Sequence, residues 1–279
     1  MSVLLPLLRR PRIAFGLLVA LALVIAALAA PWLSPHDPLD QDLYNAFAKP
    51  FWAGGDGAHP LGTDSLGRDL LSRLIHGARV ALLVAFIAAL FAGLLGTLLG
   101  LAAGYYGGKV DSAISRLVEI WMSFPSVLLC IVLAAVLGAG LHTVVIAIII
   151  IDWTRFCRVV RAEVLVQKNR DYVASAVTIG LRPARILWQE ILPNVVPLLL
   201  TLFTLEMGIA IVVEAILSFV GLSSANVPTW GGIIQEGRLY VNQAWWLMAA
   251  PMLCIIVAVL GMNALGDGLR DALDPVKAR

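Results

Sequence analysis

Three carboxylates lie in segments that are otherwise strongly apolar, and they have the clearest potential for chemistry. Glu206 and Glu214 share one apolar run, and Asp152 lies in another. A carboxylate in such a segment is costly unless it faces a cavity or a partner group. Eight residues apart, Glu206 and Glu214 lie within about 80° of each other around a helix, which favours a shared face.

Two interpretations are open for this pair. In the first, Glu206 and Glu214 line a solute path and attract a cationic end of the solute. In the second, they pair with Arg155, Arg158 or backbone groups and fix helix packing. We predict a structural role for Asp152.

A second set of polar residues, in the segment 34–79, has the residue types of a metal site or a hydrolase dyad. It comprises His59, Asp64, Asp69 and His76. No metal-ligand spacing or nucleophile motif accompanies them. We therefore interpret the segment as a folded loop in which Asp64 and Asp69 cap helix starts and Arg68 pairs locally. Neither a metal site nor a catalytic residue is predicted.

The composition places these residues in a membrane protein. Of the 279 residues, 60% are hydrophobic and 14% are charged, with a mean hydropathy of +0.91. A water-soluble protein of this length could not bury so much apolar surface in one core. The net charge of +2 gives no indication of a nucleic-acid partner. Cys130, Cys157 and Cys254 lie in apolar runs and are interpreted as buried hydrophobic residues.

Apolar runs of roughly 20 residues predict transmembrane helices. Glycines in the second run recur at the spacing of one helical turn, which lets a neighbouring backbone approach closely; they are Gly93, Gly96, Gly100 and Gly104. The pattern predicts an all-α integral membrane protein of six helices, over residues 13–33, 80–104, 114–137, 142–160, 194–220 and 245–266.

Basic residues predict the orientation. With the N-terminus inside, the cytoplasmic segments hold 15 of the 20 Lys and Arg residues, and the outer segments hold the other 5. Both termini are therefore expected to be cytoplasmic. The predicted divisions are a cytoplasmic N-terminus at 1–12, a transmembrane helix at 13–33, an outer segment at 34–79, a five-helix core at 80–266 with a cytoplasmic loop at 161–192, and a cytoplasmic tail at 267–279.

The charged loop 161–192 is the most informative segment. A short helix is expected to end at Gly180, which tolerates a left-handed conformation, and a second helix to begin near Pro183. Pro193 is expected to start a new direction. The predicted helix-turn-helix lies along the cytoplasmic face, where it could dock a soluble partner.

This loop resembles the cytoplasmic "EAA" loop of bacterial ABC-importer permeases. The match covers Ala176, Gly180 and the ending Ile191-Leu-Pro-Asn194, whereas Ala174 stands where the pattern has glutamate. The resemblance implies contact with an ATPase subunit through Asp171, Tyr172, Ser175, Ala176, Gly180, Arg182 and Pro193.

Further motifs resemble the dipeptide/oligopeptide/nickel permease family, specifically its second permease. The longest is His59-Pro-Leu-Gly-Thr-Asp-Ser-Leu-Gly-Arg-Asp69, and the resemblance covers roughly residues 10–276. Other matching pieces are Gly104-Tyr-Tyr-Gly-Gly108, Phe124-Pro125, Asn169-Arg-Asp-Tyr172, Glu214-Ala215, Pro228-Thr-Trp-Gly231 and Gly266-Asp-Gly-Leu-Arg-Asp-Ala-Leu-Asp-Pro275.

The resemblance implies a type I ABC importer permease in the bacterial inner membrane. Its implied partners are a homologous second permease, two ABC ATPase subunits and an extracytoplasmic solute-binding protein. This chain has no Gly-x-x-x-x-Gly-Lys-Ser/Thr loop, so ATP and Mg²⁺ are expected on the partner ATPases, and no cofactor is expected here.

The solute and the energy source leave alternatives. Peptides are the expected solute, with nickel or a metal chelate as the alternative. An ion-coupled secondary transporter is the rival of a different class, although such proteins usually show repeats and broken helices, and no repeat is found here. An intramembrane enzyme would need a nucleophile or metal-ligand set within the spans, and none is found.

Overall fold

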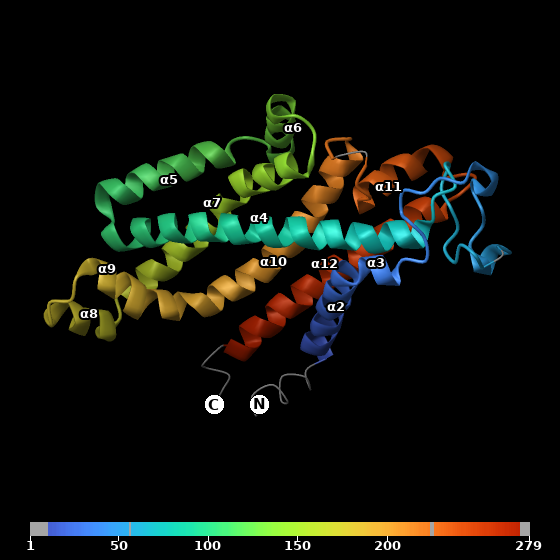
Figure 1. Cartoon of the computed structure of the whole chain (residues 1–279). Coiled ribbons are helices and arrows are strands. Elements are labelled where there is room, and N and C mark those ends of the chain that lie inside the picture. The colour runs from blue at the N-terminus through green and yellow to red at the C-terminus, as the bar shows by residue number, and fades with distance from the viewer. Residues whose placement is uncertain (1–10, 56, 224–225, 274–279) are drawn as a thin grey trace.

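The computed structural model describes residues 11–55, 57–223 and 226–273. Within these ranges the protein is helical, and an isolated bridge between Thr63 and Asp69 is the extent of its β-structure. The elements are α2 (Pro11–Leu28), α3 (Ala30–Leu33), η1 (Leu43–Asn45), η2 (Phe51–Ala53), α4 (Leu70–Tyr106), α5 (Gly108–Met122), α6 (Ser126–Leu137), α7 (Leu141–Lys168), α8 (Asp171–Thr178), α9 (Pro183–Arg185), η3 (Ile186–Ile191), α10 (Leu192–Phe219), α11 (Trp230–Gly237), η4 (Arg238–Tyr240) and α12 (Trp246–Leu273). Helix α4 runs along most of the molecule, with α8 and α9 at one end and α11 and the loop before α4 at the other (Figure 1).

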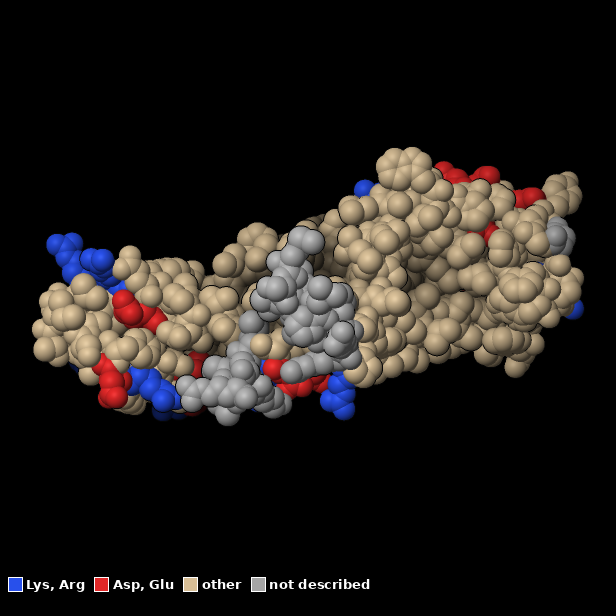
Figure 2. All heavy atoms as spheres, turned by 90° about the horizontal axis from the view of Figure 1, so that it is seen from below, with Lys and Arg blue, Asp and Glu red and all other residues tan. Residues whose placement is uncertain are grey.

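The described residues include four helices long and apolar enough to cross a membrane. They are α2, α4, the run Pro183–Phe219 and α12, and the bent pair α5–α6 passes the same test jointly. Helix α7 is long enough to cross a membrane but is not among the helices that are apolar enough, because Asp152, Arg155 and Arg158 interrupt its apolar sequence. On the face shown in Figure 2, the broad tan surface toward the end opposite α8 carries few charged side chains, as expected for a lipid-facing band.

The helix that contains the second predicted span, 80–104, begins ten residues before it. Helix α4 begins at Leu70, where the Asp69 carboxylate accepts a hydrogen bond from the Ser72 backbone N–H at 2.8 Å. Residues 70–77, which lie in the predicted outer segment 34–79, thus belong to the long helix. Its charged Arg73 can be buried there because it forms ion pairs with Asp64 and Glu236.

The third predicted span, 114–137, is also wrong as a single helix. Helices α5 and α6 meet at an angle of 85°, with the break over 123–125. Pro125 supplies no backbone N–H and disfavours a helical conformation at Phe124, so the α5 helix ends before it.

The prediction that the chain takes a new direction at Pro193 is also wrong, because the helix continues through this residue. The residues before it form the π-helical turn η3, and the run from Pro183 to Phe219 is one helix. A wider turn relieves the clash between a proline ring and the preceding turn of the helix, which explains why Pro193 does not break it.

Close packing of α4 on α7 confirms the prediction from the glycine spacing. A Cβ atom at Gly100 would lie 2.7 Å from the Cys157 carbonyl oxygen, and one at Gly104 would lie 2.7 Å from the Val164 Cβ. The backbones of the two helices therefore approach as closely as small residues allow.

Gly100→Ala is expected to lower the melting temperature of the purified protein. The added methyl group would displace the α7 backbone at a cost of about 1–3 kcal/mol. Gly93→Ala, on the same helix, is the matched control, because its Cβ would meet side-chain atoms of Phe156 at 3.3 Å and no backbone atom of α7 as closely as at Gly100. Equal melting temperatures for the two variants would contradict the role of Gly100 in packing.

Candidate functional site

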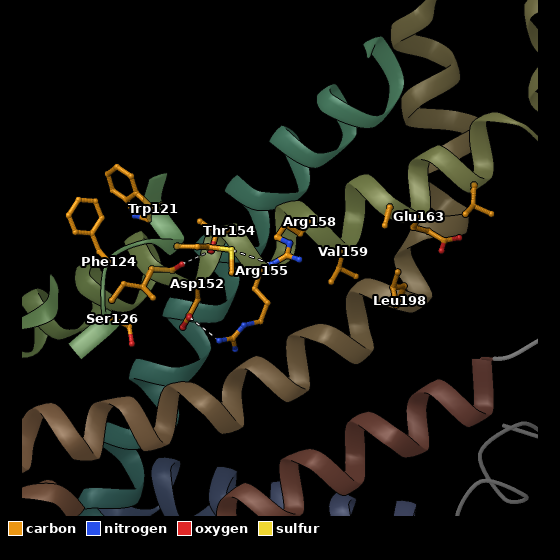
Figure 3. Close-up of a pocket in the computed structure, with 14 residues that line it drawn as sticks. Trp121, Phe124, Ser126, Asp152, Thr154, Arg155, Arg158, Val159, Glu163 and Leu198 are labelled. Atoms are coloured by element: carbon orange, nitrogen blue, oxygen red, sulfur yellow. Dashed lines mark hydrogen bonds and ion pairs between the residues drawn. The ribbon is translucent and has the colours of Figure 1, made fainter. Parts of the chain in front are cut away.

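A groove of about 650 Å³ opens beside the break between α5 and α6, against α7. Aromatic and charged side chains line it together (Figure 3). Trp121 comes from the last turn of α5 and Phe124 from the break, whereas Asp152, Arg155 and Arg158 come from α7. Trp121 Nε1 donates a hydrogen bond to the Ile150 carbonyl, which attaches the break to α7. Such a mixture of apolar walls and a few charges is typical of a small-molecule site.

Arg155 connects this groove to the carboxylate of Glu206. Its Nη1 atom lies 3.1 Å from both Glu206 carboxylate oxygens, and its Nη2 atom lies 3.8 Å from Asp152 Oδ1. The Arg155 side chain is 46% exposed, whereas that of Glu206 is 1% exposed. The structure thus contains an ion pair between Glu206 and Arg155, as the interpretation in which the glutamates fix helix packing predicted. Its role in lining a solute path stays a prediction.

Glu214 lies deeper in the protein and has a different partner. The Ser218 hydroxyl donates to Glu214 Oε1 at 2.6 Å, and Oε2 has no hydrogen-bond partner among the described residues. Both glutamates are fully buried within this chain. The structure therefore shows Glu214 held within its own helix, and its predicted role in lining the path also remains open.

A bidentate ion pair holds α5 against α7 at the side of the groove. Arg161 Nε and Nη2 lie 2.5 and 2.7 Å from the two Asp111 carboxylate oxygens. Planar, bidentate pairs of this kind fix orientation as well as distance. Asp111 and Arg161 therefore hold the helix that carries Trp121 at its end.

The loop 161–192 folds as the helix-turn-helix that its sequence predicts. Helix α8 spans Asp171–Thr178, Gly180 follows with a φ of +84°, and Pro183 begins α9. A φ in this region strongly favours glycine. On the inner face of α8, Val173 and Ala176 pack in a cluster with Val164 of α7 and Ile186 and Ile191 of η3.

The predicted contact residues of this loop divide into two groups. Asp171, Ser175, Gly180, Arg182 and Pro193 are exposed, as docking would require, whereas Ala176 is buried in the cluster and supports α8 from inside.

Tyr172 is half-buried, and its hydroxyl donates to Gln167 Oε1 at 2.7 Å. Burial raises the pKa of the Tyr172 phenol, so it stays a neutral donor. This hydrogen bond connects α8 to the end of α7, and contact of Tyr172 with an ATPase stays a prediction.

The loop before α4 contains an ion-pair network that the sequence revealed only in part. Arg68 Nε lies 2.7 Å from Asp64 Oδ2, which confirms the predicted local pair, and Arg68 Nη2 also lies 2.6 Å from Glu236 Oε2 of α11. The predicted cap at Asp69 is confirmed. Asp64 does not begin a helix: its Oδ1 accepts from the backbone N–H groups of Leu66 and Arg68 in a tight turn.

Comparison with known proteins places this arrangement in a family. Residues 96–279 match the family of binding-protein-dependent transport system inner membrane components, and residues 3–50 match the N-terminal transmembrane domain of oligopeptide transport permease C. The chain belongs to this family of transport permeases.

Two relatives of this permease show how far the match extends. The di/tripeptide transport system permease DppC of Pseudomonas aeruginosa is 42% identical over 93% of this chain and 86% of its own length. The dipeptide transport system permease DppC of Escherichia coli K12 is 40% identical over 93% of this chain and 87% of its own length. The resemblance predicted from the sequence motifs is thereby confirmed.

A solved transporter shares the fold of this permease. An inward-facing MetNI methionine ABC transporter aligns with a TM-score of 0.60 at 19% identity, over 72% of this chain and 96% of that one. This similarity concerns the fold, and it agrees with the predicted importer-type bundle.

Sequence reasoning missed the groove, although it identified several of its residues separately. Asp152 was predicted to be structural, and Arg158 was one of several possible partners for the glutamates. In the structure Glu206 pairs with Arg155, whereas Arg158 faces the groove and lies 3.4 Å from the Met122 sulfur. The signal that could have located the groove is the Phe124-Pro125 break, which ends one helix beside the charged stretch of the next.

Proposed function

We propose that this permease forms half of the translocation pathway of an ATP-driven importer for dipeptides and related short peptides. The observation that carries the proposal is the 40–42% identity, over 93% of the chain, to permeases named for di- and tripeptide transport. The second half of the pathway is a homologous permease. Two ATPase subunits and an extracytoplasmic solute-binding protein complete the importer.

In this proposal the chain crosses the bacterial inner membrane six times, with both termini in the cytoplasm. Helix α7, which contains the predicted span 142–160, is one of these six although the three charged residues in that span exclude it from the helices that are apolar enough by composition. Its 28 residues would extend about 42 Å, which exceeds the hydrocarbon thickness. Charged side chains are tolerated in a span when they face a cavity or an opposite charge. Here Arg155 has Glu206, and Arg158 faces the groove.

The groove beside α7 is the part of the chain that we assign to solute passage. A peptide carries a carboxylate at one end, and Arg158 offers an exposed guanidinium among aromatic and apolar side chains. The loop 161–192 is assigned to ATPase contact, because α8 rests on a buried cluster and presents polar and apolar side chains outward. Movement of α8 would pass directly to α7 and η3, on which it is packed, and through η3 to α10.

The proposal is tested by purification from native membranes and by uptake of a radiolabelled dipeptide. An ATPase and a second permease are expected to co-purify with the tagged chain, and the ATPase is expected to be lost when residues 170–185 are replaced by a neutral linker. Uptake should require ATP and be inhibited by excess unlabelled dipeptide. Uptake of Ni²⁺ instead would indicate the metal importer, and uptake driven by an ion gradient without an ATPase would contradict the proposal.

A further inference from the structure

Two histidines and an aspartate converge at the end of the molecule opposite α8. The nitrogen and oxygen atoms that His36, His59 and Asp69 can offer to a ligand all lie within 4.8 Å of one another. His59 Nδ1 lies 3.0 Å from Asp69 Oδ1, and His36 Nδ1 lies 3.9 Å from the same oxygen. The sequence interpretation considered His59 and Asp69 together with His76, and it did not include His36.

The two oxygens of Asp69 have separate roles. Oδ2 accepts from the Ser72 backbone N–H at 2.8 Å and from the Ser72 hydroxyl at 2.7 Å, and so caps α4. Oδ1 faces the two imidazole rings. Its distance to His59 is that of a hydrogen bond, but 3.9 Å to His36 is too long for one. Capping α4 therefore uses only the Oδ2 atom of Asp69, and the Oδ1 atom is directed at the two histidines.

The surrounding contacts hold the three side chains in place. The His36 backbone N–H donates to the Ser72 hydroxyl at 3.1 Å, so the same serine positions both His36 and Asp69. The two imidazole rings lie with their centroids 4.6 Å apart, tilted by 35°. Outer-shell contacts of this kind orient metal ligands in proteins. The side chain of His36 is 41% exposed and leaves an entry path, whereas that of Asp69 is fully buried.

We propose that His36, His59 and Asp69 form a Zn²⁺ site. Zinc binds histidine nitrogen and carboxylate oxygen at about 2.0–2.2 Å, so neighbouring ligands of a tetrahedral ion lie about 3.3 Å apart. The distances of 3.0 and 3.9 Å from Asp69 Oδ1 to His59 and His36 bracket this value, and all three ligand atoms lie within 4.8 Å of one another. Two imidazoles favour zinc over Mg²⁺ or Ca²⁺, which prefer oxygen ligands. Three protein ligands leave a fourth position for water.

The site would stabilise the loop before α4. Its ligands come from three separate stretches: the segment after α3, the middle of the loop and the start of α4. Between α3 and α4 the described regular structure is limited to the short turns η1 and η2. A metal ion that joins the three stretches would reduce the freedom of this loop, because a site formed only in the folded chain adds its binding free energy to folding.

The test measures Zn²⁺ binding by the full chain, purified with its accompanying subunits through a tag that contains no histidine. Chelator-treated protein is titrated with Zn²⁺ against a fluorescent zinc indicator, and bound metal is counted by mass spectrometry. We expect His36→Gln, which alters an exposed side chain, to weaken zinc binding by roughly a hundredfold. Asp69→Asn should do the same while keeping α4 capped, because asparagine is an equally good cap.

His142→Gln is the matched control, since it makes the same change at a histidine outside the cluster. It should bind zinc as the unaltered chain does. Added Zn²⁺ should also raise the melting temperature of the unaltered protein and of His142→Gln, but not that of His36→Gln. The proposal is overturned if the unaltered chain binds no zinc, or if His36→Gln and Asp69→Asn bind it as tightly as the control.

Discussion

Ile179→Asp is expected to release the ATPase subunits from the permease and to reduce ATP-driven peptide uptake by at least tenfold. Ile179 follows α8 directly, and 78% of its surface is exposed. Val177, two residues earlier, is 57% exposed as well, and neighbouring exposed apolar side chains are typical of a surface that contacts a protein partner. A carboxylate buried in that contact would cost about 2 kcal/mol, which weakens binding roughly thirtyfold.

The measurement is the amount of ATPase that co-purifies with the tagged chain, together with dipeptide uptake by the same cells. Leu239→Asp is the matched control. It places the same charge on a similarly exposed apolar residue, 72% exposed, at the opposite end of the molecule. This variant should retain the ATPase. If Ile179→Asp retains as much ATPase as the control, α8 and its turn do not form the proposed contact with the ATPase.

Local signals in the sequence predicted much of the helical framework. The glycine spacing in α4 predicted the close approach of α7, and Gly180 with Pro183 predicted the turn that the loop adopts. These features depend on backbone geometry within a few residues, and such geometry can be read from residue type and spacing.

Prolines were harder to interpret, because their effect depends on the turn around them. Pro125 breaks a helix by 85°, whereas Pro193 lies in a continuous one after the π-helical turn η3. The presence of a proline does not by itself tell which of the two helices breaks. The difference lies in whether the preceding turn can widen, which tertiary packing decides.

The candidate sites were predictable only where both partners of a contact are conspicuous. Arg155 and Glu206 are charges in apolar helices, so each had to find a partner, and the sequence interpretation included this pair. His36 gave no such signal. It meets Asp69 because the chain after α3 returns to the start of α4, a long-range contact that the residue spacing does not encode.

Arg155→Met is expected to destabilise the permease by about 3 kcal/mol, measured as a lower melting temperature in lipid nanodiscs. Removing the guanidinium leaves the buried Glu206 carboxylate without a counter-ion, beside Asp152. Breaking a buried ion pair by removing one partner costs about 3–5 kcal/mol. The lower end is expected here because 46% of the Arg155 side chain is exposed and part of its charge is screened by water.

The double variant Arg155→Met with Glu206→Gln separates loss of the pair from loss of packing. Glu206→Gln removes the carboxylate charge that Arg155→Met leaves without a counter-ion, so most of the lost stability should return. Arg158→Met is the matched control. Its guanidinium faces the groove and contacts the Met122 sulfur, so its loss should change the melting temperature little. If the double variant melts as low as Arg155→Met, the ion pair is not the source of the destabilisation.

The same variants distinguish the two roles considered for the buried glutamates. If Glu206 serves packing alone, the double variant should fold and take up cationic and neutral dipeptides in the same ratio as the unaltered chain. If Glu206 attracts the cationic end of the solute, Glu206→Gln should selectively reduce uptake of dipeptides that contain lysine. Glu214→Gln extends the test to a carboxylate whose contact is the serine one turn along its own helix, at 2.6 Å. Because no arginine depends on Glu214 in the described contacts, a change in solute preference there would reflect the pathway and not a broken ion pair.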